Sequence, residues 1–521
     1  MAKEETHHLF WADQIAAEAK ARNGRHVVGD AKTPSGRIHV GSLRGVLIHD
    51  VIYKALKDAG HKAEYVYRFD DLDPMDGFPP GVPESLREHM GKPLCDVPSP
   101  EKGFDSFAEF FALEFKDVFE KLDCKPKIAW SSKLYRAGKV NDLIRMALEN
   151  AEVFNEINER VSGAKKPKGW LPINVVCEEC GKIGTTTATD FDGKTVAYQC
   201  QDVKYAKGCK HSGRISPFDG NAKLTWKADW SAAFVLHGVT VEGAGKDHYA
   251  AGGSRDVANE VVEKIFSYPH PYNFPYEFFI FRGKKMSTSK GVGVSAKEIG
   301  DALPPELLRF LMTRYKPNTA IDFNPDGETI PRLFSDWDRF SDVYFGHQTA
   351  RDPDVPRIFA FSQVSGKKPK DHFKPPFSFV SFLVQVPGVD EAKVITTYKG
   401  SFLTEDEKKE LNHRIEYSKI WLATFAPEDA KLVIVDKPDY VSLSPQQKKA
   451  LAEFADAFEK EKDVQRQADA IKQICETHGL KVNDFFAAAY RVFLGKDKGP
   501  KLLPFFGALD KQMVLERLRG A

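Results

Sequence analysis

The stretch that decides the fold reads HVVG at residues 26–29, TPSGRIHVGS at 33–42 and AEYVYRF at 63–69. The first and last segments are short apolar runs typical of β-strands, and TPSG has the composition of a turn. Between them, apolar residues recur at helical spacing from Leu43 to Leu56, and Gly60 is a helix stop signal. This strand–turn–helix–strand order predicts an α/β fold with a doubly wound parallel sheet.

The pattern is interrupted at residues 165–225, which contain four of the seven cysteines. We interpret this segment as a small inserted module. The α/β pattern then resumes, with helices and strands expected at 228–237, 239–242, 254–266 and 276–281. After residue 297 helices dominate, and Thr404 and Ser444 are placed to cap two of them. The sequence therefore predicts an α/β domain carrying an insertion, followed by an all-α region.

The composition sets limits on the class of protein. The 521 residues carry 75 Lys and Arg against 74 Asp and Glu, a formal net charge of +1. This balance excludes a uniformly basic nucleic-acid-binding surface but not a local basic face. The length is typical of roughly three or four domains, and 42% hydrophobic residues suffice for large cores. Because neither a secretory signal nor a membrane-length apolar segment is found, we expect a cytoplasmic protein without membrane contact.

Four cysteines form two pairs, Cys177-x2-Cys180 and Cys200-x8-Cys209. Two pairs of soft ligands on short hairpins are typical of a tetrahedral, structural Zn²⁺ site. His211 is an alternative to Cys209 as the fourth ligand, and buried free thiols are the alternative to a metal site. An odd, sparse set of cysteines in a long chain argues against a disulfide framework.

The turn at residues 33–42 lies where the first strand meets the first helix. In open α/β sheets ligands bind at the carboxyl ends of strands, and a helix N-terminus favours phosphate. His39 is able to donate a hydrogen bond to a phosphoryl oxygen, and Gly41 lets a ligand approach the backbone. The alternative is an ordinary turn with a histidine satisfied within the protein.

A second loop, RGKKMSTSKG at 282–291, combines lysines with glycine and serine. Such a loop suits a polyphosphate, because its cations neutralise charge that develops on phosphoryl oxygens. A solvated basic loop is the alternative. The sequence contains no Gly-x-x-x-x-Gly-Lys-Ser/Thr motif, which disfavours a P-loop nucleotidase.

Together, the His-x-Gly turn and the Lys-Met-Ser-Thr-Ser-Lys loop resemble the paired motifs of class I aminoacyl-tRNA synthetases. The form Pro-Ser-Gly-x-x-His-x-Gly is similar to the subgroup of glutamyl-, glutaminyl- and class I lysyl-tRNA synthetases. KLTWKADW at 223–230, GKDH at 245–248 and PYEF at 275–278 resemble the class I lysyl-tRNA synthetases in particular. The resemblance covers residues 25–325 and is weak in the helical C-terminal third.

The resemblance implies a ligase that activates L-lysine with ATP and transfers it to tRNA(Lys), with Mg²⁺ and a structural Zn²⁺, as a monomer. The implied domains are a Rossmann-type catalytic domain at 1–297 with a zinc-binding insertion at 165–225, a connecting helical segment at 298–345, and an α-helical anticodon-binding domain at 346–521. Two alternatives are a glutamyl-type class I synthetase and a non-catalytic synthetase-like paralogue that binds amino acid or RNA. A zinc-ribbon nucleic-acid adaptor is disfavoured, because the cysteine segment is a small part of the chain.

The same resemblance assigns roles to individual residues. The catalytic set is His39, Lys285, Ser287, Ser289 and Lys290. The ATP-binding set is Gly36, Gly41, Ser42, Gly245, Asp247 and Met286. The lysine-binding set is Thr33, Trp226, Asp229, His248 and Tyr276, with Asp229 or Asp30 offering the negative charge for the ammonium. Two positions depart from the general class I pattern: Ser42 replaces a second histidine, and Thr288 replaces the second lysine of the loop.

Overall fold

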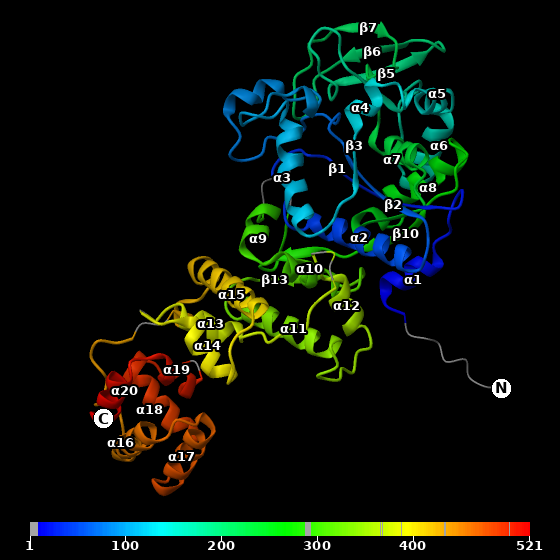
Figure 1. The fold of residues 1–521 in the computed structure, drawn as a ribbon. Helices are drawn as coiled ribbons and strands as arrows, with labels where there is room; N and C mark the ends of the chain where they lie inside the picture. Colours follow the sequence, from blue (N-terminus) through cyan, green and yellow to red (C-terminus); the bar gives the residue numbers. More distant parts are fainter. Residues whose placement is uncertain are drawn as a thin grey trace, which may run out of the picture. The chain divides into compact units, whose positions relative to one another are not determined.

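The computed structural model describes residues 9–286, 293–364, 366, 368–386, 388–431, 434–499 and 501–521. The chain forms two compact units. The first comprises Met1–Asn324 and Gly346–Pro369, and the second comprises Pro325–Phe345 and Lys370–Ala521. Figure 1 traces the elements of each unit along the chain.

A five-stranded parallel sheet forms the centre of the first unit. Its strand order is β10-β9-β1-β2-β3, with β1 at His26–Lys32, β2 at Ala63–Phe69, β3 at Lys127–Trp130, β9 at Val241–Gly245 and β10 at Tyr272–Tyr276. Strand β1 is central, and it pairs with β2 over its whole length. The predicted parallel sheet is confirmed, and β1 extends three residues beyond the predicted end at Gly29.

Helices surround this sheet in the first unit (Figure 1). The predicted helix after the first turn is α2, Ser42–Asp58, whose apolar residues are buried. The helices predicted at 228–237 and 254–266 are α7, Trp226–His237, and α8, Ser254–Lys264. The remaining helices are α1 Trp11–Glu18, α3 Phe107–Lys121, α4 Ser131–Arg136, α5 Asn141–Glu149, α6 Ala151–Ser162, α9 Ala296–Ala302, α10 Pro305–Thr313 and α12 Val355–Phe361.

The strand predicted at 276–281 is wrong. The structure has two strands there, β10 and β11, Phe279–Phe281, and they belong to different sheets. Pro275 lies within β10, which is tolerated because β10 is an edge strand and its missing N–H faces no partner. Strand β11 pairs with β13, Ile321–Phe323, and with β12, Lys284–Lys285. The strand predicted at 239–242 is shifted to β9.

The inserted cysteine-bearing segment is a small antiparallel module. Its three-stranded sheet consists of β5 Thr186–Phe191, β6 Val196–Cys200 and β7 Ser212–Ile215. A second pair, β4 Ile173–Val175 and β8 Ala222–Leu224, connects the module to the helices of the first unit. Figure 1 shows β5–β7 at the opposite end of this unit from α10 and α12.

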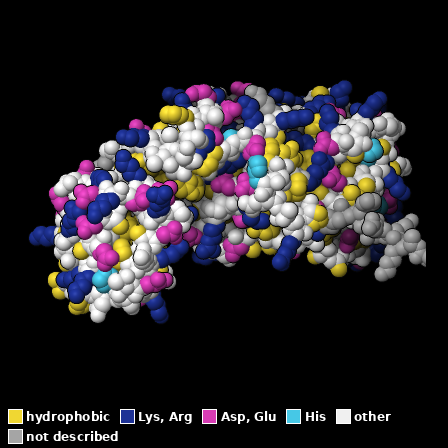
Figure 2. Space-filling model, turned by 60° about the horizontal axis from the view of Figure 1, so that its bottom comes forward, with side chains coloured by type: hydrophobic (Ala, Val, Ile, Leu, Met, Phe, Trp, Pro, Cys, Tyr) yellow, Lys and Arg dark blue, Asp and Glu magenta, His cyan; other side chains and the backbone are white. Residues whose placement is uncertain are grey.

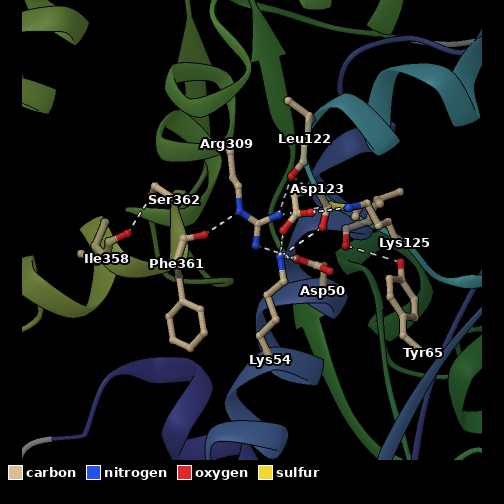
Figure 3. Close-up of polar contacts among 12 residues, drawn as sticks. Asp50, Lys54, Tyr65, Leu122, Asp123, Lys125, Arg309, Ile358, Phe361 and Ser362 are labelled. Atoms are coloured by element: carbon tan, nitrogen blue, oxygen red, sulfur yellow. Dashed lines mark hydrogen bonds and ion pairs between the residues drawn. The ribbon is translucent and has the colours of Figure 1, made fainter. Parts of the chain in front are cut away.

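A fully buried arginine joins four segments of the first unit (Figure 3). Arg309 on α10 donates to the carbonyl oxygen of Leu122 at 2.9 Å and to the carbonyl oxygen of Phe361. Its guanidinium also pairs with Asp50 on α2, which Lys54 contacts at 3.1 Å. Because a buried cation is stable only when it is paired and hydrogen-bonded, this network fixes α10 and α12 against α2 and the C-terminal end of α3.

The second unit is helical, as predicted. Its helices are α11 Thr329–Tyr344, α13 Phe377–Leu383, α14 Glu391–Lys399, α15 Glu405–Thr424, α16 Pro445–Lys460, α17 Val464–Thr477, α18 Val482–Leu494, α19 Leu502–Ala508 and α20 Lys511–Arg519. Thr404 forms the predicted capping box with Glu407. Ser444 is the predicted N-cap, and it also forms a capping box, with Gln447. Across the described ranges, no helix has both the length and the apolar character needed to cross a bilayer.

Candidate active site

Two adjoining cavities open at the carboxyl ends of β1, β9 and β10, where the sequence predicts ligand binding. The larger, the Trp226 cavity, has a volume of about 470 Å³ and is lined by the whole set predicted for lysine: Thr33, Trp226, Asp229, His248 and Tyr276. The smaller, the Lys285 cavity, has a volume of about 280 Å³ and includes Gly41, Ser42, Asp247 and Lys285. His39, Gly245 and Met286 line both. Gly36 lies in the same turn as His39 but lines neither.

The two sequence motifs meet in the structure although they are far apart in the chain. The Val40 N–H donates to the Val294 carbonyl at 3.0 Å, and the Ala296 N–H donates to the Ile38 carbonyl at 2.9 Å. These bonds hold the predicted phosphate turn against the segment that follows the lysine-rich loop. Within that loop, Ser287, Thr288, Ser289 and Lys290 lie outside the described residues.

His39 faces the cavities with an unsatisfied ring. Its Nδ1 atom is buried and has no hydrogen-bond partner among the described residues. Burial, assisted by the nearby charge of Lys32, lowers the pKa of His39 to about 4. The imidazole is therefore neutral at pH 7, with one N–H to donate to a ligand. Gly41 leaves room for this ring, because a Cβ there would lie 2.9 Å from Nδ1.

Lys285 and Asp247 contact each other at the mouth of the smaller cavity. The Lys285 ammonium lies 2.6 Å from a carboxylate oxygen of Asp247 and 3.9 Å from the centre of the Phe278 ring. Both charged side chains are more than half exposed, at 56% and 57%. A cation predicted to bind phosphate and a carboxylate predicted to bind ribose thus contact each other in the structure.

Three aromatic rings form one wall of the larger cavity. Trp226 stacks on Trp230 with ring centres 6.0 Å apart, and His248 lies 5.9 Å from Trp226 and 5.3 Å from Trp230. Although it begins a helix, Trp226 is 51% exposed, so it is not a core residue. His248 is oriented by Ser254, whose hydroxyl lies 2.9 Å from its Nδ1. Such a wall suits the methylene chain or the cationic head of an amino acid.

Charged residues that the sequence analysis did not assign lie beneath this wall. The buried Asp229 carboxylate accepts from Arg68 at 2.8 Å and from the Tyr135 hydroxyl at 2.6 Å, and Lys223 lies 3.2 Å away. Burial alone would raise the pKa of Asp229, but Arg68 and Lys223 lower it to about 2. Asp229 lines the cavity as predicted, yet its oxygens are already occupied by three donors.

Asp30 differs from Asp229 because its partner is a histidine and not an arginine or a lysine. Burial would lower the pKa of His49, but Asp30 and Glu242 raise it. The Asp30 carboxylate lies 3.3 Å from His49 and 3.4 Å from the Tyr65 hydroxyl, and it lines both cavities.

Gly45, on the adjacent turn of α2, was also missed: a Cβ there would lie 2.7 Å from the Tyr276 hydroxyl. Its sequence signal was a glycine within an apolar helix, where glycine is unfavourable unless something approaches closely.

The four cysteines of the module converge. The Sγ atoms of Cys177, Cys180, Cys200 and Cys209 all lie within 4.8 Å of one another. The Cys177–Cys209 and Cys180–Cys200 distances are 3.6 and 3.8 Å. Four thiolates at about 2.3 Å from a tetrahedral Zn²⁺ would be about 3.8 Å apart, so the donor set fits that ion. His211 does not belong to this cluster, so among the described residues the group that the structure brings together consists of the four cysteines.

A third cavity, the Trp170 cavity, has a volume of about 590 Å³ and adjoins the Trp226 cavity, with which it shares Thr33, Trp226 and Lys223. Its lining includes Ile183, which follows the first cysteine pair, and the aromatic Trp170. Lys166 and Lys227 add positive charge, and the Lys166 ammonium lies 4.6 Å from the centre of the Trp170 ring. The cysteine module therefore contributes a residue to the lining of a cavity that adjoins the candidate active site.

Comparison with known families decides the class of protein. Residues 9–365 match the family model described as tRNA synthetases class I (K), and residues 422–521 match an anticodon binding domain. The chain belongs to the class I (K) tRNA synthetase family. Family membership and the α/β fold with a helical C-terminal region were both predicted from the sequence, and both are confirmed.

Relatives of this class I synthetase extend over its whole length. A lysine–tRNA ligase 1 from Methanosarcina acetivorans is 34% identical, and a lysine–tRNA ligase from Methanosarcina barkeri is 32% identical, each over 98% of both chains. A lysine–tRNA ligase from Archaeoglobus fulgidus is 31% identical over 98% of this chain and 100% of its own. Among solved structures, a glutamate–tRNA ligase from Elizabethkingia meningosepticum matches with a TM-score of 0.43 and 12% identity, over 95% of this chain and 99% of that one.

Proposed function

We propose that this class I synthetase activates L-lysine with ATP and transfers the lysyl group to tRNA(Lys). The observation that carries the proposal is the junction of two cavities at β1. One is lined by aromatic and acidic residues that suit a cationic amino acid, and the other by His39, Gly41 and the N-terminus of α2, which suit phosphate. The full-length likeness to lysine–tRNA ligases supports lysine as the amino acid.

In the proposed reaction the lysine carboxylate attacks the α-phosphorus of ATP, and pyrophosphate leaves in line. The neutral His39 donates its N–H to a phosphoryl oxygen, and Ser42 and the first turn of α2 offer further donors. Gly36 lets the turn pass close to the nucleotide, Gly245 and Asp247 hold the ribose, and Met286 borders the base. Lys285, Ser287, Ser289 and Lys290 then contact the pyrophosphate. Bound to ATP, Mg²⁺ would supply positive charge that neutralises part of the phosphate charge.

We propose that lysine lies along the aromatic wall with its ε-ammonium directed to Asp30. Trp226 and His248 cover the methylene chain, and Tyr276 and Thr33 border its two ends. Asp30 is favoured over Asp229, because the Asp229 oxygens already accept from Arg68, Lys223 and Tyr135. Asp229 then acts by positioning Arg68 and Lys223 below the cavity.

The four cysteines are proposed to bind one structural Zn²⁺. The Cys209 N–H lies 3.4 Å from Cys200 Sγ, and the Thr185 hydroxyl lies 3.2 Å from the same atom. Donors directed at a sulfur are expected around metal-bound thiolates, because they stabilise the negative charge. A site with four protein ligands has no open position for a reactant, so the ion would hold the module in shape.

The tRNA is proposed to contact the two units separately. The acceptor end enters through the Trp170 cavity, where Trp170 and Trp226 are available for stacking and Lys166 and Lys227 for phosphate. The helical region 346–521 binds the anticodon, region 298–345 connects it, and region 1–297 is the catalytic domain. Figure 2 shows Lys and Arg side chains mixed with Asp and Glu on the face drawn, in agreement with the near-neutral net charge. We propose that the enzyme acts as a monomer in the cytoplasm.

Exchange of radioactive pyrophosphate into ATP tests the activation step. Each amino acid is supplied in turn, with and without total tRNA, so that a requirement for tRNA is detected as well. We expect lysine to give the highest kcat/KM. Faster exchange with glutamate would replace the proposal by a glutamyl-type enzyme, and no exchange with any amino acid under either condition would favour a non-catalytic paralogue.

A further inference from the structure

Lys32 is the last residue of β1, and its side chain lies where the two cavities join. It lines the Trp226 cavity together with Thr33 and His248, and it lines the Lys285 cavity together with Ser42 and Asp247. Side chains two residues apart on a strand share a face, so Lys32 and Asp30 lie on the same side of β1. Under the proposed function, the amino-acid carboxylate must meet the α-phosphate at this junction.

The Lys32 ammonium has no hydrogen-bonding or ion-pair partner in the described part of the chain. Burial lowers the pKa of Lys32, and the neighbouring Asp30 only partly opposes this effect. An ammonium held near apolar and cationic groups without a partner costs free energy. A basic side chain that has no partner and lies where two cavities join is therefore suited to bind an anionic ligand.

The other cations around the two cavities are either neutral at pH 7 or already paired. His39 and His248 both have a lowered pKa, chiefly because they are buried. Arg68 and Lys223 are held by Asp229, Asp70 and Asp73. Lys285 is paired with Asp247. Within the described part of the cavity lining, Lys32 is therefore the basic side chain that remains without a partner and is available to a substrate.

We propose that Lys32 is a catalytic residue of adenylate formation, whose ammonium contacts the substrate carboxylate and the α-phosphate as they react. This inference rests on the proposed function. A bond forms between a carboxylate oxygen and the α-phosphorus, the bond from that phosphorus to the bridging oxygen breaks, and pyrophosphate takes the electron pair. Lys32 transfers no proton. It aligns two anions that repel each other and stabilises the charge on the equatorial oxygens between them.

The position of Lys32 on the strand also orients the substrate. Asp30 offers a carboxylate and Lys32 an ammonium on one face of β1, separated by about 6.6 Å along the strand at about 3.3 Å per residue. A lysine molecule has the opposite arrangement, with an ammonium at one end and a carboxylate at the other. The Asp30–Lys32 pair therefore favours binding with the carboxylate towards the nucleotide.

Lys32→Met tests the inference because methionine keeps most of the length and removes the charge. We expect kcat for pyrophosphate exchange with lysine to fall about 100-fold or more, as when a preorganised donor to a developing charge is removed. Lys32→Arg should recover a large part of this loss. The melting temperature of Lys32→Met should equal or exceed that of the wild type, because an unpaired buried charge is removed.

Lys62→Met is the matched control. Lys62 is exposed and immediately precedes β2, so it lies at the amino ends of the strands, whereas the cavities lie at their carboxyl ends. It should leave kcat unchanged. If Lys32→Met retained kcat within about threefold of the wild type, the catalytic role would be overturned. The catalytic role would also be overturned if the melting temperature and kcat fell together, because a lysine with a purely structural role would give that result. Wild-type enzyme that fails to exchange with lysine would instead contradict the proposed function.

Discussion

The Lys285 ammonium lies 2.6 Å from the Asp247 carboxylate, although the two residues belong to different sequence motifs. Asp247 follows the carboxyl end of β9, which lies between β10 and β1 in the parallel sheet, and Lys285 ends the β11–β12 hairpin that leads into the lysine-rich loop. Each partner is predicted to contact a different part of ATP. Under the proposed function, both partners of this ion pair would contact ATP, so we expect the pair to exchange its contacts for contacts with the nucleotide.

Asp247→Ala should weaken ATP binding without unfolding the protein. Loss of a charge-assisted hydrogen bond is worth about 1.5–3 kcal/mol, so the KM for ATP should rise roughly tenfold or more. An exposed ion pair contributes only about 0–1 kcal/mol to stability, so the melting temperature should change little.

The control for this variant is Asp301→Ala, which breaks a similarly exposed pair with Lys297, and neither of these residues lines the two cavities. It should leave the KM for ATP at the wild-type value. Equal KM values for Asp247→Ala and the wild type would exclude Asp247 from the nucleotide site.

Gly45→Ala should disturb the lysine pocket through Tyr276. The added Cβ would lie 2.7 Å from the Tyr276 hydroxyl, so the ring has to move, at a cost typical of overpacking, about 1–3 kcal/mol. We expect the KM for lysine to rise more than the KM for ATP. Gly507→Ala is the matched control, because this helical glycine has open space around it, and alanine there should be neutral or stabilising. A lysine KM unaffected by Gly45→Ala would show that Tyr276 does not border the substrate.

His39 gives the stability of the protein a specific dependence on pH. Its pKa is lowered to about 4 in the folded state from an ordinary value of 6.5. Between these values the unfolded chain binds a proton that the native protein does not, so the free energy of unfolding falls as pH falls from 6.5 to 4. A shift of this size corresponds to about 3 kcal/mol.

Urea unfolding of the wild type and of His39→Asn at pH 7, 5.5 and 4 measures this contribution. The difference between the two proteins cancels the effect of the other titrating groups, including His237, whose pKa is also lowered to about 4. We expect the wild type to lose more stability than the variant towards pH 4. Parallel curves for the two proteins would contradict a neutral, buried His39.

Metal content distinguishes zinc ligands from free thiols. Protein purified without chelators should contain one Zn²⁺ per chain, and Cys177→Ser should lose it, together with the order of β5–β7. His211→Ala is the control and should keep the metal, because His211 does not belong to the cysteine cluster. Elemental analysis of the three proteins decides the point, and a metal-free wild type would leave four thiols without a structural role.

In Cys177→Ser, the rate of transfer to tRNA should fall more than the rate of pyrophosphate exchange, because the module borders the Trp170 cavity rather than the proposed nucleotide site.

The parts of the fold and site that follow from local pattern were predictable from the sequence. The unit β1–α2–β2 is predictable because its periodicity is local, and the Cys177–Cys180 spacing directly indicates the cysteine cluster. Strand β10 was missed because Pro275 is unfavourable in a strand unless the strand lies at an edge, and edges are set by tertiary pairing. The roles of Arg68 and Lys223 were missed because their ion pairs join segments distant in the chain. The role proposed for Lys32 does not follow from the sequence, since the lack of a partner for its ammonium exists only in the folded protein.

Charging of tRNA is the measurement that tests the central claim most directly. Purified enzyme is incubated with ATP, total tRNA and each of two radioactive amino acids, lysine or glutamate, and the charged tRNA is then identified. The account predicts ATP-dependent attachment of lysine to tRNA(Lys) and none of glutamate. Attachment of glutamate, or no attachment of lysine by a folded enzyme with its zinc, would contradict it.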